Sequence, residues 1–223
     1  MPIMKVVVSW SSGKDSVMTL HHVLQAGYEV AGLLCTVTDT YRRVSMHGVR
    51  EELLEKQSSS LGLPLIKAFI PPNCSNQTYE SVMQQVCLDL KNNGVESVAF
   101  GDIFLEDVRR YREKNLRVVG MNGLFPLWGR RTADLARTFF QLGYKAIVVV
   151  VDLEKLPKTY VGREYDLSFL EDLPDGCDPC GENGEFHTFV YSGPLFSKPV
   201  EFTVGGKVVR DGRFCFQDLV PTN

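Results

Sequence analysis

The chain has 223 residues, 44% of them hydrophobic, and a net charge of −3 from 24 basic and 27 acidic side chains. A chain of this length corresponds to one large domain, or to one domain with a small appendage, and it can bury about 70% of its unfolded surface, which excludes extended disorder. The slightly acidic balance disfavours a nucleic-acid partner, because proteins that neutralise many phosphates are strongly basic.

The cysteine content and the lengths of the apolar runs indicate a soluble protein. Six cysteines are far below the density of a disulfide-stapled secreted domain. The apolar start of the chain is too short for a signal peptide, and no run approaches the roughly 18 apolar residues of a membrane span. We therefore expect a cytoplasmic protein without a membrane partner.

Short β-branched runs alternate with helix-length amphipathic segments through most of the chain, a pattern typical of βαβ units on a parallel sheet. The runs that we expect to form strands cover residues 4–10, 29–37, 64–70, 96–101 and 145–152. The segments that we expect to form helices, with apolar residues three and four positions apart, cover 15–25, 47–61, 78–92 and 132–142. Each helix ends near a glycine that can cap it, namely Gly27, Gly62, Gly94 and Gly143.

The alternation stops after Asp152, where prolines and glycine clusters become frequent. Short antiparallel strands are expected at 186–191, 200–204, 207–210 and 213–216, with turns at Gly205-Gly206 and Asp211-Gly212. The sequence thus predicts an α/β domain over residues 1–152 and a smaller α+β subdomain over residues 153–223.

The strongest chemical signal is Ser11-Ser12-Gly13-Lys14-Asp15-Ser16, placed between the first expected strand and the first expected helix. Backbone N–H groups at a helix N-terminus favour a phosphate, and Lys14 is a candidate phosphate contact. Asp15 is a candidate Mg²⁺ ligand, because a carboxylate beside phosphate oxygens is repelled unless a cation lies between them. The spacing excludes a Walker A loop. The alternative is a helix N-terminus capped by serine and aspartate side chains.

This segment resembles the nucleotide loop of the PP-loop, or N-type, ATP pyrophosphatases, whose pattern is Ser-Gly-Gly-x-Asp-Ser after the first strand. The resemblance implies a Rossmann-like HUP fold, with a five-stranded parallel sheet and flanking helices. It also implies ATP as the cofactor, bound by residues 11–16 and cleaved to AMP and pyrophosphate. Ser12 stands where the family has glycine, and serine fits there without strain if its φ is negative.

Further segments narrow the resemblance to the diphthine–ammonia ligase family. They are Gly101-Asp102-Ile103, the Pro126-Leu127-Trp128 motif, and Gly181-Glu182-Asn183-Gly184-Glu185-Phe186-His187-Thr188, and they occur in the family's order. In the last motif, Asn183 replaces a glycine and His187 replaces a glutamate. This variant resembles a bacterial branch that has been linked to corrinoid salvage.

The resemblance implies a ligase that activates a carboxylate as an acyl-adenylate for attack by ammonia or another amine. The carboxylate belongs to a modified protein side chain or to a small molecule. Asp15, Glu182 and Glu185 are the implied catalytic residues, and Gly101 and Asp102 join the loop in binding the nucleotide. The implied substrate-binding residues are Glu182, Asn183, Glu185, His187 and Thr188.

Each of these roles has a structural alternative. Asp102 can instead cap the next helix, Glu182 and Glu185 can belong to a solvated turn, and His187 can be a packing residue. His47, at the start of the second expected helix, is either a cap or a substrate contact.

Other groups are left open by the sequence. Cys177 and Cys180 have the spacing of a metal or redox pair, but inert thiols are the favoured interpretation. The basic segments 109–114 and 130–131 favour a charged helix face over an anion site. Phe125 and Trp128 are interpreted as core or homodimer-contact aromatics in preference to an adenine platform, which leaves a homodimer open.

Two other functions compete with the ligase. One is a tRNA-modifying enzyme of the PP-loop type, which the acidic net charge disfavours. The other is a nucleotide-binding sensor of the universal stress protein type, which shares the HUP fold but has no use for the 181–188 motif.

Overall fold

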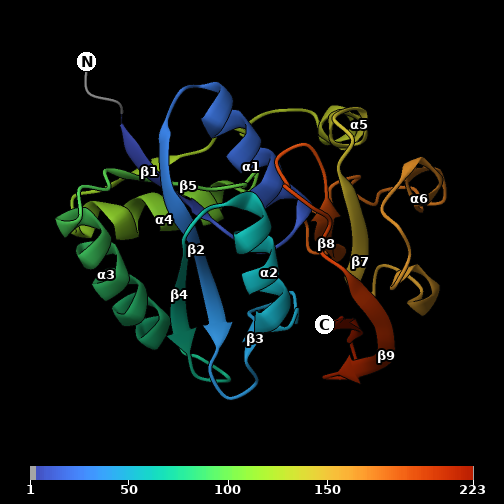
Figure 1. Ribbon diagram of the computed structural model, residues 1–223. Coiled ribbons are helices and arrows are strands. Elements are labelled where there is room, and N and C mark those ends of the chain that lie inside the picture. Colours follow the sequence, from blue (N-terminus) through green and yellow to red (C-terminus); the bar gives the residue numbers. More distant parts are fainter. Residues whose placement is uncertain (1–3, 223) are drawn as a thin grey trace.

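The computed structural model describes residues 4–222, and in this range the chain forms two β-sheets with helices between and around them (Figure 1). Parallel strands of the first sheet, sheet A, lie in the order β4 (Leu65–Ile70), β2 (Glu29–Thr38), β1 (Lys5–Ser9), β5 (Ser97–Ala99), β6 (Asn122–Leu124). A short strand, β3 (Arg43–Val44), pairs antiparallel with the end of β2. The expected α/β class with a five-stranded parallel sheet is confirmed.

Helices cover both faces of sheet A. The elements on one face are α1 (Lys14–Gln25) and α2 (Glu51–Leu61), and those on the other are α3 (Asn76–Asn92) and α4 (Glu106–Val118). The alternation along β1 explains this arrangement, since Val7 joins the core under α3 and α4 while Val8 joins the core under α1 and α2. Because the chain leaves β1 toward β2 on one side and β5 lies on the other, the carboxyl ends of β1 and β5 form a topological switch point.

Four helices end just before the expected glycines. Gly27, Gly62, Gly94 and Gly143 all have positive φ, which a side chain would strain. The charged segment 109–114 lies within α4, as the helix-face interpretation predicts. The expected start of the second helix at His47 is wrong: α2 begins at Glu51, because positive φ at Met46 and Gly48 keeps the chain in turns.

Sheet B is antiparallel, in the order β8 (Phe186–Ser192), β7 (Lys145–Asp152), β10 (Phe214–Pro221), β9 (Phe202–Arg210). The strand expected at 145–152 exists as β7, but its expected place in the parallel sheet is wrong. A continuous apolar run indicates that both faces of the strand are buried, but it does not indicate which strands are its neighbours in the sheet. The three-residue strand β6 takes the fifth parallel position instead. The division of the chain after Asp152 stays a prediction.

Short helices flank sheet B, namely α5 (Thr132–Gln141), α6 (Leu167–Glu171) and the 3-10 turn η1 (Lys158–Tyr160). The expected turn at Gly205-Gly206 is wrong, because β9 runs through both glycines with a register shift against β10. Asp211 and Gly212 form the hairpin turn, as expected, and both have positive φ. None of the helices within residues 4–222 combines the length and apolar character needed to cross a membrane.

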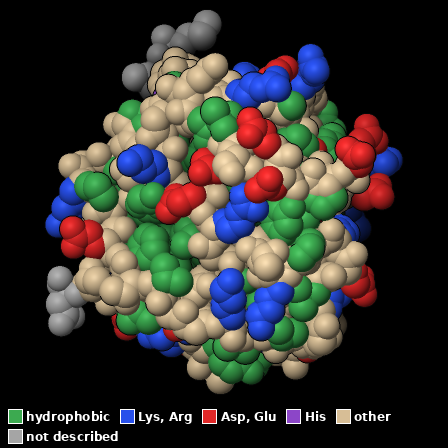
Figure 2. Space-filling view, turned by 90° about the vertical axis from the view of Figure 1, so that its right-hand side faces the viewer, with side chains coloured by type: hydrophobic (Ala, Val, Ile, Leu, Met, Phe, Trp, Pro, Cys, Tyr) green, Lys and Arg blue, Asp and Glu red, His purple; other side chains and the backbone are tan. Residues whose placement is uncertain are grey.

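The two sheets enclose α1 and α2, and one hydrophobic core runs from sheet A through these helices into sheet B (Figure 1). Leu53 of α2, Val149 of β7 and Phe189 of β8 are fully buried parts of it. Figure 2 shows the outer face on the side of sheet B, where acidic, basic and hydrophobic side chains are intermixed.

An ion-pair cluster reinforces the contact between the sheets. Asp218 of β10 accepts hydrogen bonds from Arg43 of β3 at 2.9 Å and from the Arg50 guanidinium at 2.7 and 3.1 Å. The hydrogen bonds from Arg50 hold the pKa of the Asp218 carboxyl below its usual value of 3.8. The carboxylate is therefore stabilised in its charged form at neutral pH.

Replacing Asp218 by Asn should lower the free energy of unfolding at pH 7 by about 1–2 kcal/mol, because a partly buried charged acceptor is lost. The depressed pKa means that this stabilisation is complete above about pH 4 and is lost as the pH falls through the folded-state pKa. Urea unfolding at pH 7 and at pH 3 measures the difference. As a control, Asp107→Asn removes a carboxylate that is 97% exposed and should change little. Equal effects of the two substitutions at pH 7 would contradict the assignment.

Candidate active site

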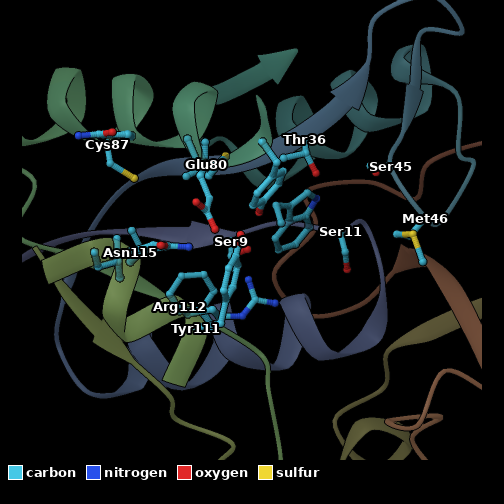
Figure 3. Close-up of a pocket in the computed structure, with 18 of the residues that line it drawn as sticks. Ser9, Ser11, Thr36, Ser45, Met46, Glu80, Cys87, Tyr111, Arg112 and Asn115 are labelled. Atoms are coloured by element: carbon cyan, nitrogen blue, oxygen red, sulfur yellow. The ribbon is translucent and has the colours of Figure 1, made fainter. Parts of the chain in front are cut away.

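A cavity of about 410 Å³ lies at the carboxyl ends of β1 and β2 and extends between α3 and α4. Figure 3 shows Glu80 and Cys87 on α3 across the cavity from Tyr111, Arg112 and Asn115 on α4. The opposite end is lined by Ser11, Ser45, Met46, His47 and His187. The cavity is therefore polar beside the loop of residues 11–16, and between α3 and α4 it is lined by both polar and apolar side chains.

Sequence reasoning did not identify the contribution of α3 to this cavity. Tyr79, Met83 and Cys87 line it from α3, and they are spaced by four residues, which puts them on one helix face. The helix was expected, but a face of mixed aromatic, thioether and thiol residues gives no sign that it borders a cavity.

The loop of residues 11–16 lies at the N-terminus of α1, as expected. Gly13 is the N-cap residue and no side chain caps the helix, so the capped-helix alternative is wrong. Ser12 is buried with a φ of 71°, so this serine adopts the left-handed conformation that favours glycine. Ser16 donates to the Gly13 carbonyl at 2.8 Å and lies 3.4 Å from the Ser11 hydroxyl. The loop is compact and held by its own side chains.

Strand β8 packs directly against this loop. The Lys14 N–H donates to the Thr188 hydroxyl at 3.1 Å, and Val190 N–H donates to the Ser12 carbonyl at 3.0 Å. A Cβ on Gly13 would lie 2.9 Å from the Thr188 carbonyl oxygen, so the approach requires glycine. The structure thereby brings Thr188, predicted as a substrate residue, to the loop of residues 11–16.

The Lys14 ammonium points toward the 177–182 segment. It is almost fully buried, donates to Asp15 at 2.9 Å and to the Cys180 carbonyl, and lies over the rings of Tyr165 and Phe186. Burial lowers the pKa of this ammonium, but the negative charges around it, above all Asp15, outweigh burial and leave the pKa raised. Lys14 thus stays charged and ties α1 to the segment that precedes β8.

Asp15 lies at the switch point between β1 and β5. A Cβ on Gly101 would come within 3.0 Å of the Asp15 carbonyl oxygen, so glycine is needed where β5 ends. A third of the Asp15 side chain is exposed (33%), yet burial of the carboxyl raises its pKa despite the pull of Lys14. A further negative charge beside the Asp15 carboxylate, without a cation to neutralise it, is therefore unfavourable.

Asp102 follows β5 and forms an ion pair with Arg112 of α4, with 2.6 Å between Oδ2 and Nε. The alternative role as a helix cap is wrong, because Leu105 is the N-cap of α4 and has no side-chain cap bond. Arg112 also stacks on Phe100, 4.5 Å from the ring centroid, and lines the cavity. Sequence reasoning assigned this arginine to a charged helix face, since the partner ten residues away is not visible in a pattern of three and four.

Glu182 faces the same switch point. Its Oε1 accepts the Ile103 N–H at 2.7 Å. Burial, with Asp15 and Asp102 as negative neighbours, raises the pKa of this carboxyl to about 7. Asp15, Asp102 and Glu182 are thus close enough to influence one another. Within residues 4–222, no group of three or more histidine, cysteine or acidic side chains is arranged as a complete metal site.

Glu185 and Asn183 are oriented differently from Glu182. Glu185 is buried, so the solvated-turn alternative is wrong for this residue, and its Oε1 accepts from the Asp178 N–H at 3.2 Å and from the Asn183 amide at 3.1 Å. The second carboxylate oxygen has no partner. In this arrangement Glu185 organises the 178–183 segment.

Two histidines meet at the polar end of the cavity. The rings of His47 and His187 lie 4.6 Å apart at an angle of 30°, and His47 Nδ1 is 3.2 Å from the Thr188 carbonyl oxygen. Burial lowers the pKa of His187 to about 4, with Lys14 acting in the same direction, and burial lowers that of His47 well below its usual range. Both imidazoles are neutral at pH 7. His47 lies beside the loop of residues 11–16, whereas the sequence had left it as either a helix cap or a substrate contact.

The remaining candidate groups have structural partners. Cys180 is buried, and burial raises the pKa of its thiol, as it also does for Cys177. This favours inert thiols. Arg109 pairs with Glu113 at 2.9 Å and stacks on Trp128, in line with the predicted charged helix face.

Comparison with known proteins gives a consistent picture. Residues 4–123 match the family model of the diphthamide synthase N-terminal domain, and residues 131–214 match that of the diphthamide synthase C-terminal domain. The chain is 25% identical over 220 residues to the diphthine–ammonia ligase of Homo sapiens, a match covering 88% of this chain and 82% of that protein. The Mus musculus enzyme of the same name is 27% identical over 228 residues, with the same shares covered. The Schizosaccharomyces pombe enzyme is 26% identical over 220 residues, covering 90% of this chain and 36% of that protein.

Replacing Glu182 by Gln tests the crowding of carboxylates at the switch point. The folded protein binds this proton more tightly than the unfolded chain, so the free energy of unfolding falls as the pH rises from about 4.5 to 7. The substitution should therefore raise the free energy of unfolding at pH 8 by about 1–3 kcal/mol, and the gain should disappear toward pH 4.5. Urea unfolding across this range measures it, with Glu106→Gln as the exposed control. An unchanged free energy of unfolding at pH 8 would contradict the raised pKa of Glu182, because it would mean that ionisation of this carboxyl does not destabilise the folded protein.

Proposed function

This chain belongs to the diphthamide synthase family, and we propose that it is an ATP-dependent ligase that forms a carbon–nitrogen bond. In the proposed reaction, a carboxylate attacks the α-phosphorus of ATP, and pyrophosphate leaves as the acyl-adenylate forms. Ammonia or another amine then attacks the acyl carbon, AMP leaves, and the nitrogen loses a proton. The product is an amide.

The observation that carries this proposal is the convergence of three features at one sheet edge. The loop of residues 11–16 lies at the start of α1 beside the 410 Å³ cavity, and Asp15 and Glu182 interact electrostatically at the adjoining switch point. A helix N-terminus stabilises phosphate, and a largely apolar cavity of this size suits a nucleoside. We therefore place the phosphates of ATP at the loop and its nucleoside in the cavity.

The residues present fit Mg²⁺. Burial raises the pKa of Asp15, so a cation beside its carboxylate would be favoured over an unneutralised charge. Mg²⁺ commonly binds through one or two carboxylates together with substrate phosphates. Asp15 would hold the ion, which would neutralise the phosphate oxygens during pyrophosphate release.

The chain's own groups account for the remaining chemistry. The dipole and free N–H groups of α1 favour the negative charge that develops on the leaving pyrophosphate. Glu182, with a pKa of about 7, is suited to accept the proton that the attacking amine must lose. The neutral His187 at the cavity's polar end can hydrogen-bond the carboxylate substrate without a net charge.

The related proteins are named for diphthine and ammonia. For this chain we propose a carboxylate substrate on a protein side chain or a small molecule, and ammonia or an amine as the second substrate. Asn183 and His187 depart from the family motif in the segment proposed to bind the carboxylate. We therefore expect the carboxylate substrate of this chain to differ from that of the related enzymes.

Incubation with ³²P-labelled ATP, Mg²⁺, ammonia and a panel of carboxylates tests the proposal. Pyrophosphate release that requires a carboxylate, with AMP formed in equal amount, is the expected result. Tight ATP binding without turnover for any acid would instead favour a nucleotide sensor.

Asp15→Asn should reduce pyrophosphate release by on the order of 100-fold or more, because a charged ligand for the metal and phosphates is lost. Circular dichroism should show an unchanged fold. The matched control is Asp134→Asn, which removes a first-turn carboxylate from α5 and should leave turnover unaffected. Turnover at the wild-type rate in the Asp15 variant would refute the nucleotide-loop assignment.

A further inference from the structure

Gln57 is a fully buried glutamine on the apolar face of α2. Its Oε1 accepts from the Trp10 indole N–H at 3.0 Å, at the end of β1. Its amide nitrogen donates to the Ser12 carbonyl at 3.0 Å and to the Val190 carbonyl at 2.6 Å. One side chain thus joins α2 to the end of β1, the nucleotide loop and strand β8.

The Ser12 carbonyl is held from two directions, because Val190 N–H also donates to it at 3.0 Å. Ser12 itself has a φ of 71°. For a residue with a Cβ, this left-handed conformation costs about 1–2 kcal/mol relative to the right-handed one. Its own hydroxyl has no partner, so the side chain does not contribute to holding the conformation. The hydrogen bonds to the carbonyl therefore maintain the turn.

The orientation of the Ser12 carbonyl determines whether the loop directs an N–H group or a carbonyl oxygen toward a bound anion. In a planar trans peptide, the C=O and the following N–H point in opposite directions. Because Gln57 and Val190 hold the Ser12 oxygen inward, the Gly13 N–H points away from them, toward the Ser11 hydroxyl at 3.4 Å. A flipped peptide would change ψ of Ser12 and φ of Gly13, leave φ of Ser12 positive, and turn a carbonyl oxygen toward the anion.

We propose that Gln57 is a positioning residue that holds the Ser12–Gly13 peptide with its N–H directed to the anion site of the loop. Gln57 touches no substrate and acts through Ser12. The inference rests on the proposed function only for the identity of the anion, ATP, since the peptide orientation is a property of the free protein.

Gln217 provides a matched control within the same chain. It is also a buried glutamine, and its amide nitrogen donates to the carbonyls of Gly205 at 2.7 Å and Asp218 at 3.1 Å. These bonds lie between β9 and β10, in sheet B. Methionine at either position keeps the side-chain length and removes the hydrogen bonds, so a general loss of stability should be similar for Gln57→Met and Gln217→Met.

Calorimetric titration with MgATP, together with urea unfolding, separates positioning from stability. We expect Gln57→Met to raise the Kd about tenfold, whereas Gln217→Met keeps the wild-type Kd. Equal Kd values for the two methionine variants would overturn the inference.

Hydrogen exchange of the Gly13 and Lys14 amides, followed by NMR without nucleotide, tests Gln57 separately from ATP. Faster exchange at these amides in Gln57→Met, with wild-type exchange in Gln217→Met, supports the positioning role. Unchanged exchange in Gln57→Met overturns it. If the wild-type protein binds no ATP while exchange changes as expected, the proposed function fails and the inference about Gln57 stands.

Discussion

The hydrogen-bonded contact between the loop after β1 and strand β8 is the interaction on which the site depends. It joins Ser12 to Val190 and Lys14 to Thr188, pairs that are more than 170 residues apart. A buried backbone group left without a partner costs about 1–3 kcal/mol, so neither segment is satisfied until the two dock. The docking also makes a single core of the region between the sheets, with α1 and α2 enclosed. The loop of residues 11–16 and β8 are therefore held together as one unit.

The electrostatics of the site follow from this docking. Closing β8 over the loop buries Lys14 and brings the segment carrying Glu182 to the switch point occupied by Asp15 and Asp102. Charges removed from water need partners, and Lys14 supplies one for Asp15 while Arg112 supplies one for Asp102. Burial, with Asp15 and Asp102 as negative neighbours, raises the pKa of Glu182 to about 7, although the Ile103 N–H acts in the opposite direction. A strongly shifted pKa at the carboxyl edge of a sheet is typical of active sites.

The local parts of the structure were accessible from the sequence. The helices ending at Gly27, Gly62, Gly94 and Gly143 were predictable, because apolar spacing and a capping glycine lie within one stretch of chain. The loop of residues 11–16 was predictable for the same reason, since strand, small residues and helix follow one another directly. The pairing of β7 was not, because its apolar run is compatible with a parallel or an antiparallel neighbour.

By itself, the sequence determined the α/β class, the position of the loop of residues 11–16 before α1, and the motifs that relate this chain to the diphthamide synthase family. Only the tertiary structure decided that β7 belongs to sheet B, that Asp102 pairs with Arg112, and that Glu182 and Glu185 serve different neighbours. It also singled out Gln57, whose bonds to Trp10 and Val190 span 47 and 133 residues. The reason is physical: periodicity and caps act within one element, whereas the partner of a buried polar group is chosen by how distant elements pack.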